Sequence, residues 1–78
     1  MLDSKHMGRM IRYHRKRAGP TRVQLADLCG VGKTAVYDLE NGKPTVRFNT
    51  LAAVLTGLNI APDWSSPLMK EFLEAEDA

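Results

Sequence analysis

Apolar residues in this 78-residue chain recur mostly at three- or four-residue intervals, which places their side chains on one face of an α-helix. Met7, Ile11 and His14 follow this spacing near the N-terminus, with basic residues on the other faces. The pattern predicts a helix over about residues 4–17, in which His14 is either satisfied by a hydrogen bond or half-buried. The Gly-Pro pair at 19–20 ends it, because glycine accepts a left-handed cap and proline prevents continuation.

A second helix is predicted over about residues 22–29. Thr21 precedes it and Gln24 follows three positions later, the spacing of a capping box, in which each side chain bonds the backbone of the other residue. Gly30 ends the helix, at a turn that needs a positive φ. The side chains that we expect this helix to bury are Leu25, Ala26 and Leu28.

A third short helix is predicted over about residues 33–41, with Gly32 at its start and Val36 and Leu39 facing inward. Two short helices joined by a three-residue turn containing glycine form a helix-turn-helix. The small Ala26 suits the point where the two helices cross. We therefore predict a helix-turn-helix at residues 21–42.

Two more helices are predicted in the second half of the chain. The first, over about residues 50–57, is strongly apolar and has Asn49 as a cap. The second, over about residues 67–76, has Ser66 as a cap and Pro67 at its first position. The segment between them admits a short extended stretch, although Pro62 forbids a central strand. The fold class expected is all-α, a compact domain of five helices.

Charge divides the chain into two parts. Residues 1–50 contain ten lysines and arginines and four acidic residues, a net charge of +6, whereas residues 51–78 carry a net charge of −4. A basic region suits a polyanion such as nucleic acid. The acidic end either faces away from that partner, or meets another protein, or serves only to keep the chain soluble.

Several function classes are disfavoured by the composition. Cys29 is the single cysteine, which leaves no internal disulfide and no zinc site, and we interpret it as a small core residue. No apolar run approaches the length of a membrane span and no signal peptide is recognisable, so a cytoplasmic protein is expected. No nucleophile, base and orienting acid come together in the sequence. We therefore expect neither an enzyme nor a metal or other cofactor.

The sequence resembles the lambda-repressor-like, Xre-type helix-turn-helix family over about residues 8–60. The resemblance is carried by Gly8-Arg9-Met10-Ile11-Arg12, Arg15, Gly19, Thr21, Leu25-Ala26, Gly30-Val31, Val36, Leu39-Glu40-Asn41-Gly42-Lys43, Thr50-Leu51, Val54-Leu55 and Leu58. Within the family, the segment 41–51 is most similar to HipB-like antitoxins of Hip-type toxin–antitoxin pairs. Such proteins are dimers that bind a palindromic double-stranded DNA operator, repress their own operon and contact a HipA-like kinase toxin.

The resemblance implies a DNA-binding domain over residues 1–60 and a dimerisation or partner-binding extension over 61–78. It also implies that the third helix enters the major groove. The residues expected to read bases are Lys33, Thr34 and Tyr37. The residues expected to contact phosphates are Arg12, Arg15, Thr21, Arg22, Asn41, Lys43 and Arg47.

A homodimer is expected to use apolar residues beyond the helix-turn-helix. These residues are Leu55, Leu58, Ile60, Trp64, Leu68 and Phe72. Trp64 suits either an interface anchor or an ordinary core position. HipB-like relatives pair a short strand between subunits after the fourth helix, which corresponds here to Asn59–Ala61.

Three positions depart from the family pattern. Arg22 replaces a usual glutamine, Gly32 replaces a usual capping serine, and Pro20 replaces a usual leucine or methionine. Base recognition therefore depends more heavily on the remaining residues of the third helix. Two alternatives stay open: a protein-interaction module that uses this scaffold without specific DNA binding, and a stand-alone repressor with no toxin partner.

Overall fold

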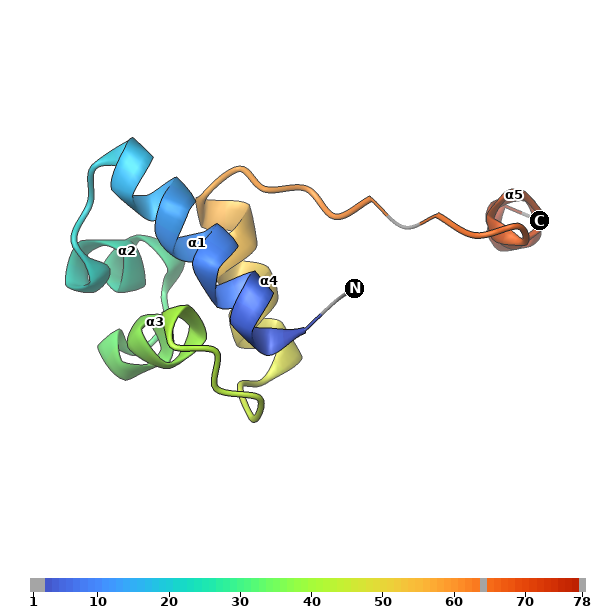
Figure 1. Ribbon diagram of the computed structural model, residues 1–78. Coiled ribbons are helices and arrows are strands. Elements are labelled where there is room, and N and C mark those ends of the chain that lie inside the picture. Colours follow the sequence, from blue (N-terminus) through green and yellow to red (C-terminus); the bar gives the residue numbers. More distant parts are fainter. Residues whose placement is uncertain (1–2, 64, 78) are drawn as a thin grey trace.

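The computed structural model describes residues 3–63 and 65–77, which form five α-helices and, over that range, no β-strand (Figure 1). The helices are α1 (Ser4–Ala18), α2 (Arg22–Cys29), α3 (Lys33–Glu40), α4 (Phe48–Gly57) and α5 (Met69–Glu76). The all-α class and the five helices are as predicted, and the bounds of the first three agree with the sequence analysis to within one residue.

Helix α1 begins and ends at residues suited to those positions. The Asp3 carboxylate accepts a hydrogen bond from the backbone N–H of His6 at 2.6 Å, and Gly19 closes the helix with a φ of 106°. His14 is exposed, and its Nδ1 lies 2.7 Å from the carbonyl oxygen of Met10, so of the two predicted arrangements the hydrogen-bonded one is found. The ring is not half-buried because the inward stripe of α1 runs through Ile11 and Arg15.

The predicted capping box of α2 is present. The Thr21 hydroxyl accepts from the N–H of Gln24 at 3.1 Å, and the Gln24 side chain accepts from the N–H of Thr21 at 2.8 Å. Gly30 ends the helix with a φ of 71°, as the turn requires. Leu28, however, is 71% exposed rather than buried. The side chain one turn after Leu25 that faces the core is that of Cys29.

The predicted caps of the last two helices are wrong. Helix α4 begins at Phe48 after Arg47, so Asn49 lies inside the first turn. Helix α5 begins at Met69, because the preceding residues form a turn in which the Met69 N–H donates to the Ser66 carbonyl. Neither helix has a side-chain cap. Local capping chemistry therefore does not decide where these two helices start.

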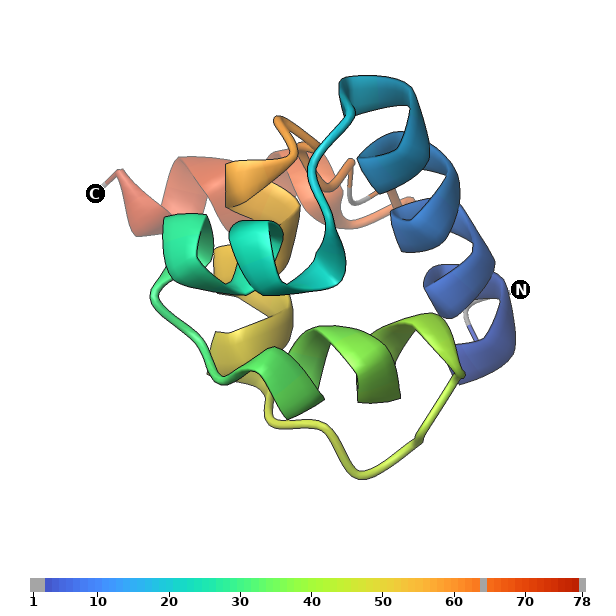
Figure 2. The same cartoon turned by 90° about the vertical axis from the view of Figure 1, so that its left-hand side faces the viewer.

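Helices α1 to α4 pack around one small core. Helix α3 contacts α1, α2 and α4, and α2 also contacts α4. Figure 2 shows α2 and α3 as adjacent short helices, with α1 beside them. The buried apolar residues are Ile11, Leu25, Ala26, Val36, Leu39 and Val54. Ala26 and Val36 thus occupy the inward positions expected of them, where α2 and α3 cross.

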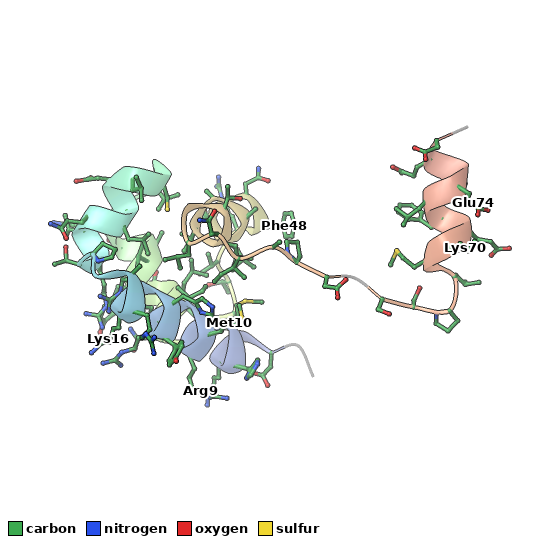
Figure 3. The ribbon with its side chains drawn as sticks, turned by 90° about the horizontal axis from the view of Figure 1, so that it is seen from above. Arg9, Met10, Lys16, Phe48, Lys70 and Glu74 are labelled. Atoms are coloured by element: carbon green, nitrogen blue, oxygen red, sulfur yellow. The ribbon has the colours of Figure 1, made fainter. Side chains whose placement is uncertain are left out.

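Helix α5 stands apart from the other four helices at the end of an extended segment (Figures 1 and 3). The apolar side chains of Leu68, Phe72 and Leu73 are more than half exposed, and Met69 is partly buried. The other residues of α5 are exposed, including Lys70 and Glu74. Helix α5 thus presents an apolar face that the other residues described by the structure do not cover.

Candidate nucleic-acid interface

The outer face of α3 consists of polar and aromatic side chains. Lys33 and Thr34 are exposed in its first turn, and Tyr37, one turn later, is 54% exposed. On the opposite face, Val36 and Leu39 are buried against α1 and α2. The three residues predicted to read bases therefore lie on the accessible side of the second helix of the helix-turn-helix.

A buried ion pair lies beneath this face. The Arg15 Nε donates to Glu40 Oε2 at 2.5 Å and Nη2 donates to Glu40 Oε1 at 3.1 Å, while Nη1 donates to the Pro20 carbonyl at 3.1 Å. Arg15 is 7% exposed and Glu40 is 9% exposed. Two parallel bonds between a guanidinium and a carboxylate are among the stronger polar contacts in proteins. The pair joins the last turn of α1 to the last residue of α3.

The ionisation of both partners follows from this contact. Burial raises the pKa of Glu40, but hydrogen bonds and charge from Arg15 and Arg22 outweigh it and hold that pKa below the usual carboxyl value. The hydrogen bond with Glu40 raises the pKa of Arg15. Glu40 therefore stays ionised wherever carboxyl groups normally do.

The predicted phosphate contacts differ in how available they are. The Arg15 guanidinium is buried and bonded to Glu40 and to the Pro20 carbonyl, so the prediction that it contacts a phosphate is wrong. Arg12 lies exposed on α1. The Thr21 hydroxyl accepts from the Gln24 N–H and can still donate its own proton. The Asn41 amide donates to the Tyr37 carbonyl at 2.8 Å.

Two further candidates, Lys43 and Arg47, line one shallow depression beside α3. Asp38 lies in the same depression, and its Oδ2 is 3.5 Å from the Lys43 Nζ. An exposed pair of this kind contributes little to stability, so it restrains Lys43 only weakly. The structure therefore brings these two cations together next to the middle of α3.

The Arg22 side chain contacts both Glu40 and Tyr37. Its Nε donates to Glu40 Oε1 at 3.1 Å, and its guanidinium carbon lies 5.7 Å from the centre of the Tyr37 ring. Its side chain is 38% exposed. The sequence analysis identified Arg22 and Tyr37 separately and did not predict that they touch.

Glu40 is the residue that sequence reasoning missed. It is one helical turn after the buried Val36, which places it on the inward face of α3. An acidic residue on an apolar stripe signals a buried cationic partner, because a lone carboxylate is costly to bury. That signal was present in the sequence.

The predicted dimer residues fall into two groups. Leu55 and Leu58 pack partly against the core, and Ile60 is partly buried. Leu68, the N-cap of α5, and Phe72 on α5 are exposed, and Trp64 lies outside the described residues. Asn59 has a φ of 60° and no strand forms at Asn59–Ala61 within one chain. A strand between subunits requires a second copy and stays a prediction.

Three further features concern Cys29, metal ligands and membrane spans. Burial raises the pKa of the Cys29 thiol, and the side chain packs against the core, as expected of a structural cysteine. Among residues 3–63 and 65–77, no group of histidine, cysteine and acidic side chains is arranged to hold a metal ion. None of the helices in those ranges is long and apolar enough to cross a membrane.

Replacing Gly32 with serine should raise the free energy of unfolding by about 0.5–1 kcal/mol. Gly32 is the N-cap of α3 with a φ of −69° and a ψ of 148°, and it offers no side-chain cap. An added Cβ meets nothing within 4 Å. The measurement is urea unfolding at one protein concentration.

Gly30→Ser is the matched control for this experiment. Its Cβ also meets nothing, but its φ of 71° strains a serine, so the variant should be less stable than the native chain. A destabilised Gly32→Ser would show that the start of α3 does not accept a conventional cap.

Comparison with known proteins agrees with this architecture. Residues 6–64 match the helix-turn-helix domain family. The chain is also 34% identical over 61 residues to an uncharacterized HTH-type transcriptional regulator, y4mF, of Sinorhizobium fredii, an alignment that covers 78% of this chain and 80% of the relative. Both matches span the two helices that form the candidate interface. The chain belongs to the family of helix-turn-helix domain proteins.

Proposed function

We propose that this protein is a transcriptional regulator that binds double-stranded DNA by placing α3 in the major groove. The observation that carries the proposal is the outer face of α3, where Lys33, Thr34 and Tyr37 are exposed while the opposite face is buried. Lysine donates to guanine acceptors, and threonine and tyrosine supply hydroxyl or apolar contacts to base edges. The relative described as an HTH-type transcriptional regulator supports the same role.

Contacts to the phosphates would position α3 in the groove. The available groups are the exposed or partly exposed side chains of Arg12, Thr21, Arg22, Asn41, Lys43 and Arg47. The excess of basic residues in the first 50 positions favours this polyanion, and the acidic α5 would face away from it.

We further propose that the protein acts as a homodimer on a palindromic operator, as a HipB-like antitoxin that represses its own operon. The uncovered apolar face of α5 supports a protein contact by this part of the chain, whether with a second copy or with a HipA-like kinase toxin. Sedimentation at micromolar concentration tests the dimer, and a monomer would remove the argument for a palindrome.

Lys33→Ala should weaken binding to the DNA upstream of the protein's own gene by about 1–3 kcal/mol. The assay is a mobility shift at two salt concentrations, where native binding should tighten at low salt as phosphate contacts require. Comparison with binding to an unrelated duplex of equal length measures the selectivity for the upstream DNA.

Lys70→Ala is the matched control, since Lys70 is an exposed lysine on α5, away from α3 (Figure 3). It should bind as the native chain does. Equal binding by Lys33→Ala and the native protein would contradict the assignment of α3 as the reading helix.

A protein-interaction module is the second candidate, favoured by the exposed apolar residues of α5. The two candidate functions differ in the DNA binding that they predict. An interaction module would bind the upstream DNA and an unrelated duplex equally weakly. Selective binding at physiological salt would exclude it.

A further inference from the structure

Arg22 connects the buried ion pair of the domain to the outer face of α3. On one side, its Nε donates to Glu40, whose carboxylate is also held by Arg15. On the other side, its guanidinium lies 5.7 Å from the centre of the Tyr37 ring. Glu40 is nearly buried, whereas Tyr37 is 54% exposed. A chain of contacts therefore runs from the interior to a residue on the accessible face.

These contacts restrict both side chains. A planar guanidinium can bond a carboxylate at its edge while its face lies against an aromatic ring, and a lysine ammonium lacks this geometry. The carboxylate that orients Arg22 is itself fixed by the bonds from Arg15. The Tyr37 ring thus lies against a group whose own position is set by the core.

We propose that Arg22 is a positioning residue, which holds the Tyr37 ring where its edge meets the methyl group of a thymine in the major groove. This inference rests on the proposed DNA-binding function and deepens it by assigning one base preference to a pair of residues. Aromatic side chains make apolar contacts with the thymine methyl, which other bases lack. The alternative is that Arg22 acts only as the phosphate contact proposed above, for which its charge alone would matter.

The two accounts differ for Arg22→Lys, which keeps the charge and removes the planar group. The experiment selects sequences from a random duplex library with the full chain: native, Arg22→Lys, Tyr37→Ala and the double variant. Tyr37→Ala should lose about tenfold of a thymine preference at one position. Arg22→Lys should lose a similar factor at the same position. The double variant should lose no more than Tyr37→Ala alone, because the two residues act as one unit.

A second arginine–tyrosine pair supplies the control. The Arg17 guanidinium lies 5.9 Å from the centre of the Tyr13 ring on α1, outside the proposed interface. Arg17→Lys and Tyr13→Ala should leave the thymine preference unchanged. Far-ultraviolet circular dichroism establishes that each variant retains the helices.

Several results would overturn the inference. A thymine preference retained in Arg22→Lys would show that Arg22 acts by charge alone. Losses that add in the double variant would show that Arg22 acts independently of Tyr37. A preference lost equally in Arg17→Lys would show a general effect of replacing arginine. If the native chain enriches no sequence, the proposed function fails and this inference fails with it. If the native chain enriches a sequence and Arg22→Lys keeps the same thymine preference, the inference is rejected while the proposed function stands.

Discussion

Glu40→Gln should lower the free energy of unfolding by about 3–5 kcal/mol, because it leaves the Arg15 guanidinium buried without a counter-charge. A small domain has a total stability of only about 5–15 kcal/mol, so this loss is a large fraction of the total. The measurement is urea unfolding followed by circular dichroism, at one protein concentration.

The dependence on pH gives this prediction a second test. Since the pKa of Glu40 is lowered in the folded state, its contribution is fully present above the ordinary carboxyl pKa and is lost as the pH falls through the lowered value. The difference between the native chain and Glu40→Gln should therefore shrink on acidification.

Asp38→Asn is the matched control, because it breaks the exposed pair with Lys43. Asp38→Asn should lower the free energy of unfolding by at most about 1 kcal/mol, and this loss should show no comparable dependence on pH. Equal losses from Glu40→Gln and Asp38→Asn would mean that the buried pair contributes no more than an exposed one.

Gly8→Ala should lower the free energy of unfolding by about 2 kcal/mol, although alanine is the better helix former by about 1 kcal/mol. Gly8 is buried inside α1 where that helix crosses the end of α3. An added Cβ would lie 2.7 Å from the Glu40 carbonyl oxygen and closer still to that of Leu39. Because these are backbone atoms, the clash is relieved only if α1 moves away from α3.

A comparison at the neighbouring exposed position isolates this steric cost. Arg9→Ala should be more stable than Arg9→Gly by about 1 kcal/mol, the ordinary cost of glycine in a helix. Thermal unfolding of all three variants gives the comparison. A Gly8→Ala chain more stable than the native one would show that α1 and α3 have room to separate.

Features set by neighbouring residues were predictable from the sequence. The capping box of Thr21 and Gln24 and the left-handed Gly19 and Gly30 are all present as expected. Each depends on chemistry within a few positions, and their correct placement located the helix-turn-helix. The outward position of Lys33, Thr34 and Tyr37 on α3 followed from helical periodicity alone.

Features set by tertiary contacts were not predictable in the same way. The start of α4 is an example: Asn49 is the better cap by type, yet the helix begins at Phe48, between the partly buried Val46 and Leu51. Leu28 is an apolar residue that the fold leaves exposed. In both cases the packing of neighbouring elements outweighs a local preference.

The contacts of the candidate site show the same limit. Arg15 and Arg22 were predicted to contact phosphates because they are basic and lie near the helix-turn-helix. The sequence gives no distance between residues 15, 22 and 40, so it did not predict that one carboxylate binds both arginines. Only the packing of α1 and α2 against α3 brings them together.

The separate position of α5 has a consequence for how its order is maintained. An isolated helix of eight residues is marginal in water, since nucleation is costly and few backbone bonds follow. Contact with another surface would bury Leu68 and Phe72 and supply the missing free energy. The helicity of residues 69–76 should then rise with the concentration of whatever α5 binds. Folding of this segment and association would be one coupled equilibrium.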